Sequence, residues 1–155
     1  MKYGYKASEH DELKNLIDYF IEYFGNECNL NWIDVSNVID MTSMFEDSKF
    51  NGDISQWDVS NVTNMDSMFF NSEFNSDISQ WDVSNVTNMG KMFMFSVFNG
   101  DISKWNVSKV TNMYCMFWDS KFNVDISKWN VSNVIDKRSM FTKCPIKKEY
   151  MPKFE

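Results

Sequence analysis

A 24-residue repeat runs through most of this 155-residue chain and restricts its folding more than any other feature. A Met-Phe pair recurs five times at this spacing, at positions 44, 68, 92, 116 and 140. Four full units span Asp34–Trp57, Asp58–Trp81, Asp82–Trp105 and Asn106–Trp129, and a fifth begins at Asn130 before the pattern decays. One such unit cannot bury its own apolar face, whereas stacked units share a continuous core and hydrogen-bond to their neighbours. The repeat therefore predicts a solenoid.

The apolar spacing within a unit predicts the elements of each coil. From Ile78 the sequence reads Ile-x-x-Trp-x-Val-x-x-Val-x-x-Met-x-x-Met-Phe, which follows the cadence of a leucine-rich repeat with Trp, Val and Met replacing leucine. We expect a short parallel strand near Ile78–Val83 and a short helix or helical turn over Val86–Phe93. The predicted fold class is an α/β solenoid, a leucine-rich-repeat-like, right-handed coil of about five 24-residue units with an N-terminal capping helix.

One stretch of the repeat resembles a known family. The run from Phe50 to Met65, FNGDISQWDVSNVTNM, is similar to the repeat of BspA-like leucine-rich-repeat surface proteins, and the likeness extends over about residues 28–144. The resemblance implies a leucine-rich-repeat type of fold. Proteins of that family are mostly exported by low-GC bacteria, and the resemblance of the repeats also implies adhesion or other protein binding.

The two ends of the chain are predicted to cap a single repeat domain that spans residues 1–155. Residues 1–29 form an N-terminal helical cap, 30–141 the coils, and 142–155 a C-terminal cap. Ser8-Glu9-His10-Asp11 has the form of a capping box, and an apolar stripe from Leu13 to Phe24 follows it before Gly25 ends the helix. We expect this stripe to lie on the first coil.

Charge and cysteine content bear on partners and location. The net charge is -7 and the isoelectric point is about 4.7, so direct nucleic-acid binding is not expected. No apolar run approaches the roughly 18 residues of a membrane span, and the start, Met1–Lys6, lacks the features of a secretory signal. Three cysteines without a C-x-x-C pair indicate reduced thiols. These features predict a cytoplasmic protein, or a cell-surface one if an export signal has been removed.

The sequence offers little for catalysis or metal binding. Its one histidine, His10, lies more than 100 residues from Cys115, and no third group suggests a nucleophilic site. Aspartates recur once per coil, at Asp53, Asp77, Asp101 and Asp125, which we interpret as turns that lead into each strand rather than a calcium column. We expect no enzymatic activity, no cofactor and no metal.

Aromatic residues at otherwise variable positions are the candidate protein-binding residues. Trp32 falls in a column whose other members are polar, so we expect it to face outward, unlike the core tryptophans at 57, 81, 105 and 129. Phe70, Met94 and Trp118 occupy one variable position on successive coils. The complete candidate set is Trp32, Phe70, Met94, Phe95, Tyr114 and Trp118. Such a ladder suits a protein-binding patch, although packing over the turns as a second small core and a self-dimer surface remain alternatives.

Charge is segregated along the chain. Residues 31–96 carry ten acidic groups and two lysines, whereas residues 97–155 carry ten basic and six acidic groups. We therefore expect a non-enzymatic protein–protein interaction module, an intracellular binder or inhibitor, monomeric or weakly dimeric, that docks on a basic or nucleic-acid-binding protein. A mobile-element anti-defence protein of the anti-CRISPR type is one example. The alternatives are a bacterial surface adhesion module of the BspA-like family and, formally, an enzyme.

Overall fold

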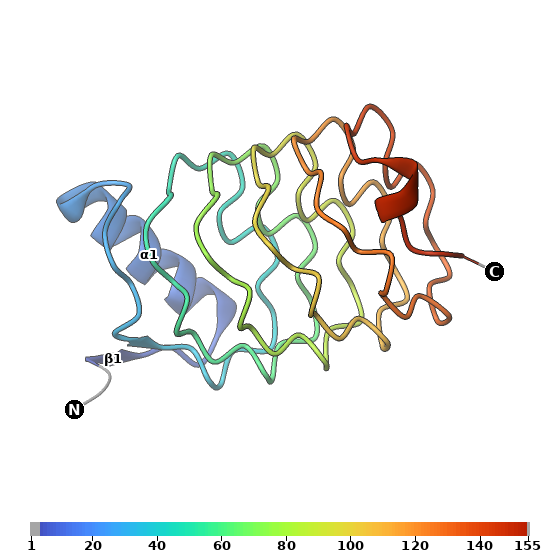
Figure 1. Ribbon diagram of the computed structural model, residues 1–155. Coiled ribbons are helices and arrows are strands. Elements are labelled where there is room, and N and C mark those ends of the chain that lie inside the picture. The colour runs from blue at the N-terminus through green and yellow to red at the C-terminus, as the bar shows by residue number, and fades with distance from the viewer. Residues whose placement is uncertain (1–3, 155) are drawn as a thin grey trace.

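The computed structural model describes residues 4–154, and the outermost parts of the two predicted caps, residues 1–3 and 155, lie outside the described residues. The chain winds through successive coils that stack along one axis, with α1 (His10–Phe24) at the N-terminal end and the 3-10 helix η1 (Lys148–Tyr150) at the other (Figure 1). Isolated parallel bridges join residues 24 apart, from Asp40 through Asn64, Asn88 and Asn112 to Asp136. We propose to class this stack as a leucine-rich-repeat-like solenoid; its right-handedness stays a prediction.

The strand and helix predicted within each coil are both wrong. Residues 78–83 form no strand, since the bridge between coils lies further along at Asn88, and residues 90–93 form turns. Lys91 has a φ of 52°, which no α-helix accommodates. The N–H of Lys91 donates sideways to the Tyr114 carbonyl of the next coil at 2.7 Å, where a helix would direct it along its own axis. Spacing of i, i+3, i+4 fits consecutive turns as well as it fits a helix, so the pattern alone could not separate them.

The strands that do form lie at the N-terminal end. The strand β1 (Tyr5–Lys6) pairs in parallel with β2 (Ile33–Asp34), with Tyr5 opposite Ile33 and Lys6 opposite Asp34. Flanking backbone bonds extend this pairing, from Gly4 N–H to the Trp32 carbonyl at 2.8 Å and from Ala7 N–H to the Asp34 carbonyl at 2.9 Å. The segment before α1 therefore covers part of the open edge of the first coil.

The helix α1 ends where predicted, but its start and one end of its apolar stripe differ. Leu13 and Ile17 are buried, and Gly25, with a φ of 83°, ends the helix by donating to the Ile21 carbonyl. The helix begins with Glu9 as its N-cap rather than the predicted Ser8, whose N–H instead donates to a Glu12 carboxylate oxygen at 2.9 Å. Phe24 is 68% exposed, so the predicted stripe stops short of it.

The histidine at the start of α1 joins the helix to the first coil in a pH-dependent way. Nδ1 of His10 lies 3.0 Å from an Asp11 carboxylate oxygen, and Nε2 lies 2.7 Å from the Thr42 carbonyl oxygen. Both partners are acceptors, so only the imidazolium form donates to both. The bond to Asp11 and then the bond to Thr42 raise the pKa of His10 above its ordinary 6.5.

We expect the start of α1 to loosen as the pH rises. Because the folded pKa exceeds the unfolded one, the stabilisation is fully present below the unfolded pKa and is lost as pH rises through the folded pKa. Native-state hydrogen exchange of the first helical amides should be faster, after correction for intrinsic exchange, at pH 8 than at pH 5.5. His10→Gln, which cannot become charged, should abolish the difference; an unchanged pH dependence in that variant would exclude His10 as its cause.

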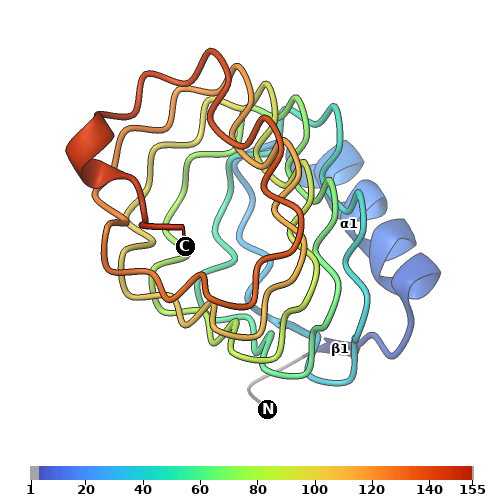
Figure 2. The same ribbon diagram turned by 90° about the vertical axis from the view of Figure 1, so that its right-hand side faces the viewer.

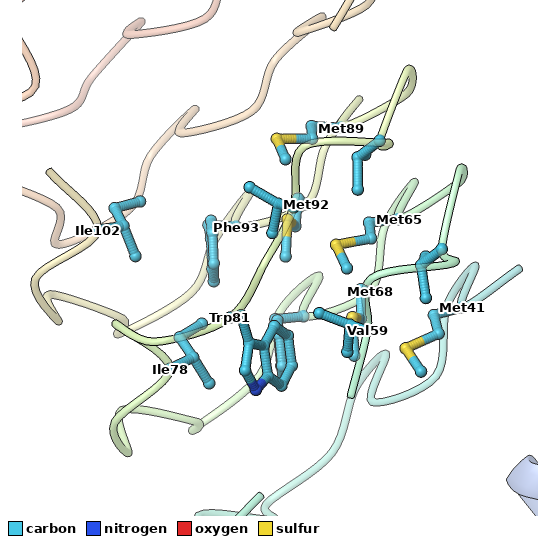
Figure 3. Packing of buried hydrophobic residues seen from close by; sticks show 14 of the residues in the cluster. Met41, Val59, Met65, Met68, Ile78, Trp81, Met89, Met92, Phe93 and Ile102 are labelled. Atoms are coloured by element: carbon cyan, nitrogen blue, oxygen red, sulfur yellow. The ribbon is translucent and has the colours of Figure 1, made fainter. Parts of the chain in front are cut away.

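The core consists of columns of identical side chains, one from each coil. Met65, Met68, Trp81, Met89 and Phe93 all point inward from the coils (Figure 3). The tryptophans at 57, 81, 105 and 129 are 4–5% exposed, which confirms that they are core residues. Their indole N–H groups donate to backbone carbonyls of the preceding coil, those of Leu30, Ile54, Ile78 and Ile102, at 2.9–3.2 Å. Each indole thus fills the core and fastens two coils together.

Candidate protein-binding surface

A segment that follows the bridge residue of each coil carries most of the candidate residues. Four alternate N–H groups of this segment donate to the same segment of the next coil, for example Met65, Ser67, Phe69 and Asn71 at 2.8–2.9 Å. Two residues per coil lie in the left-handed region of φ, as Ser67 (55°) and Asn71 (48°) do here. The resulting turns direct the Met-Phe pair inward and leave the following residue on the outside.

The structure brings Phe70, Met94 and Trp118 together in one outward column. Their backbone carbonyls accept equivalent hydrogen bonds at 2.8–2.9 Å. The donors are N–H groups of the preceding coil, those of Asp47, Asn71 and Phe95 respectively. All three side chains are half-buried, whereas their counterparts in the flanking coils, Glu46 and Thr142, are exposed. The apolar part of this column is therefore limited to three consecutive coils.

Phe95 widens this column into a patch. Its ring meets Phe70 edge-to-face, with the ring centroids 5.7 Å apart and the planes at 80°. Phe95 is 41% exposed and has a φ of 60°, an uncommon conformation for a bulky residue. Val97, two residues further on, is 42% exposed. We call Phe70, Met94, Phe95 and Trp118 the apolar patch.

Tyr114 lies on the same segment but in a different column, and its ring is partly covered. The Arg138 guanidinium lies 5.3 Å from the Tyr114 ring centroid, and Arg138 also pairs with Asp136 at 2.6 Å. A guanidinium held over a ring in this way occupies one of its faces. The structure therefore places Tyr114 beside a basic group at the C-terminal end of the stack.

Trp32 belongs to another region of the molecule, where it packs under the N-terminal cap instead of lying among polar neighbours as predicted. It is half-buried between Phe20 and Tyr5, whose ring centroids lie 4.4 and 5.6 Å away. Its indole N–H donates to the Asn29 carbonyl at 2.8 Å. The repeat places Trp32 in a column of polar residues. In the first coil alone, β1 and α1 cover that position, and the 24-residue period does not predict their contact with it.

A small cavity beside Trp32 was not foreseen from the sequence. It has a volume of about 290 Å³ and is lined by Phe20, Phe24, Cys28, Asn29, Leu30 and Trp32. The signal available in the sequence is the pair of phenylalanines four residues apart at the end of the helix, which lie on the same helical face.

The recurring aspartates serve turns, as predicted, although no strand follows these turns. Each aspartate of the recurring set accepts a hydrogen bond from the N–H of the serine two residues later, at 2.8–2.9 Å. The side-chain hydrogen bond of Ser103, and after it the bond from the Ser103 backbone N–H, lower the pKa of the Asp101 carboxyl below its ordinary 3.8. Within residues 4–154, no group of three or more His, Cys, Asp or Glu side chains is placed to hold a metal ion.

The cysteines form no disulfide, and the described helices do not have the form of membrane spans. All three cysteines are free; Cys28 and Cys144 are half-buried in the two caps. Cys115 is buried among the coils. Of the helices in the described part of the chain, none has the length and apolar character needed to cross a membrane.

Comparison with known proteins shows the family. Searches of curated proteins and of solved structures give no match to this chain. The family described as "Mycoplasma protein of unknown function, DUF285" matches it twice, over residues 14–97 and 94–147. These matches cover α1 from its second turn, all the coils and the start of the C-terminal cap. The chain therefore belongs to the DUF285 family.

Proposed function

We propose that this protein is a non-enzymatic protein-interaction module that binds its partner through the apolar patch. The observation that carries the proposal is the pair of Phe70 and Phe95, which meet edge-to-face on the outside while Met94 and Trp118 continue the patch. Large apolar and aromatic side chains in a half-buried cluster, surrounded by polar residues, are typical of the residues that dominate binding energy at protein interfaces.

The charge at the Phe70 end of the patch favours a basic partner. The coil segments 41–51 and 65–75 carry four acidic groups, Glu46, Asp47, Asp66 and Glu73, and one basic group, Lys49. Complementary charge speeds encounter and fixes orientation more than it adds affinity. An intracellular inhibitor that occludes a basic or nucleic-acid-binding protein, such as an anti-defence protein, is the finer form of this proposal.

Adhesion at the cell surface is the second candidate function. Its support is the similarity of residues 50–65 to the repeat of BspA-like surface proteins, together with membership of the DUF285 family. In this reading the same patch contacts a host protein. The two candidates therefore differ in the partner and share the binding surface.

The test is a comparison of two triple variants. Phe70→Ser, Met94→Ser and Trp118→Ser should abolish binding, whereas Gln56→Ser, Gln80→Ser and Lys104→Ser, in another exposed column, should leave it unchanged. Each variant and the wild type are immobilised and offered bacterial lysate or extracellular-matrix proteins. A bacterial partner retained by the control and lost by the patch variant supports the inhibitor, and a matrix partner with the same behaviour supports adhesion.

Thermal stability distinguishes a binding surface from a second small core. Because Trp118 is half-buried on the outside, Trp118→Ala should lower Tm by only a few degrees, corresponding to roughly 1 kcal/mol. A loss as large as that of a fully buried tryptophan would show that the patch is part of the core and would contradict the proposal.

A further inference from the structure

The last coil presents backbone donors that have no acceptor among residues 4–154. In the interface before it, the N–H groups of Met113, Cys115, Phe117 and Asp119 donate to the last coil at 2.8–3.0 Å. The equivalent N–H groups of Ser139, Phe141 and Lys143 donate to no group within residues 4–154. We call these three N–H groups the open edge. Viewed from the C-terminal end, the chain after η1 runs to the middle of the last coil (Figure 2).

The backbone conformation of the open edge favours a partner segment with the same turns. Ser139 and Lys143 have φ values of 58° and 57°, close to the 53° and 52° of Cys115 and Asp119 one coil earlier. The backbone of the open edge therefore turns at the same two positions as all the preceding coils, and it does not run straight. A regular β-strand would lose register with its donors, whereas a segment with the same two turns would keep its carbonyls opposite all three.

The positive charge beside the open edge favours an acidic partner. The side chains of Arg138 and Lys143 are 78% and 67% exposed, and Lys147, Lys148 and Lys153 follow in the tail. Within the stack, Lys143 lies 3.8 Å from the Asp119 carboxylate of the preceding coil, so this column already pairs a base with an acid. An acidic residue at the same place in an incoming coil would extend the alternation.

We propose that the open edge binds an acidic coil of the same repeat type, presented by another protein. The N-terminal end of this chain shows the complementary edge in a blocked form. The first-coil segment carries Asp40, Glu46 and Asp47, but its Thr42 carbonyl is taken by His10. Because α1 lies over that end (Figure 1), a second intact copy of this chain is not the occupant. This inference does not depend on the apolar patch.

A peptide that copies an acidic coil segment tests the proposal on the full-length protein. The probe is the labelled peptide NVIDMTSMFEDSKF, residues 37–50, and the control peptide has the same residues in shuffled order. We expect that the first peptide binds saturably and that the shuffled peptide does not, as measured by fluorescence anisotropy. In amide-resolved hydrogen exchange, the N–H groups of Ser139, Phe141 and Lys143 should gain protection when it binds.

Matched charge variants separate the edge from general attraction. Arg138→Gln with Lys143→Gln should weaken binding at least about threefold, because the two exposed basic groups beside the open edge are lost. Lys148→Gln with Lys153→Gln removes the same charge from the tail and should have little effect. Amide protection in wild-type protein keeps the test decisive if the edge variant fails to fold. Equal binding of the shuffled peptide, equal effects of the two variants, unprotected edge amides or no binding at all would each overturn the proposal.

Sedimentation of the wild-type protein alone checks the role of the cap. We expect a monomer at all concentrations, since α1 covers the end that a second copy would need. A concentration-dependent dimer whose formation protects the same three amides would overturn the statement that the occupant is another protein.

Discussion

Replacing Trp81 with alanine should lower the free energy of unfolding by about 3–5 kcal/mol. The side chain lies in the middle of the stack and is 4% exposed. Its ring stacks on those of Trp57 and Phe69, with centroids 6.5 and 6.4 Å away. Its indole N–H donates to the Ile54 carbonyl at 3.1 Å. Truncation therefore removes core volume and a hydrogen bond between coils, and it leaves the Ile54 carbonyl with the Trp57 N–H as its remaining donor.

Chemical denaturation followed by circular dichroism measures this loss, and Tm should fall by roughly 10 °C. Trp81→Phe separates the two contributions, because phenylalanine retains most of the ring but lacks the N–H donor. We expect an intermediate loss for that variant. If Trp81→Ala cost no more than Trp118→Ala, the assignment of the repeated tryptophan to the core would be untenable.

The second large effect is expected at the phenylalanine column. Phe93 is fully buried, and its ring centroid lies 5.6 Å from that of Phe69, 5.7 Å from Phe117 and 4.3 Å from Phe98. Phe93→Ala should cost about 3–5 kcal/mol, because three rings on two sides hold the space open and prevent it from collapsing. No hydrogen bond is lost, so the whole effect comes from packing.

Benzene offers a direct check on that cause. A void lined by aromatic rings stays dry and accepts small apolar molecules. Dissolved benzene should therefore raise the Tm of Phe93→Ala and leave that of the wild type unchanged. Phe141, at the same position in the last coil, is only half-buried, so Phe141→Ala is the matched control with a smaller expected loss. A cost below about 1 kcal/mol for Phe93→Ala would contradict the packing argument.

The period of the repeat predicted which residues meet, and it did so without any knowledge of local conformation. Residues 24 apart stack, the tryptophan column is buried, and the aspartates close turns on serine two residues later. Periodicity carries this information because each coil repeats the environment of the one before. Phe70, Met94 and Trp118 were aligned by the same arithmetic.

Local conformation was harder to predict because the deciding quantity is the sign of φ. Lys91 and Phe95 adopt positive φ although neither residue type favours it. The hydrogen bonds between coils, such as that from Lys91 to Tyr114, outweigh the intrinsic cost and hold the backbone there. A single sequence contains the apolar spacing but not these lateral bonds, so a helix was predicted where turns occur.

Trp32 shows a different limit. Its column is polar in every later coil, and only in the first coil do β1 and α1 lie against it. The repeat describes what a position is like in the middle of the stack and loses its meaning at the ends. The cavity beside Trp32 lies in this region for the same reason.

The constant distance of 24 residues between partners has a consequence for the history of such a chain. Hydrogen bonds between coils connect residues 22 to 27 apart, as those of Asn64 and Trp81 do, so each coil depends on its immediate neighbours alone. Duplication or loss of one complete unit in the gene would leave every remaining contact intact. Length is then a property that evolution can adjust in whole steps, while single insertions within a coil would put every later column out of register.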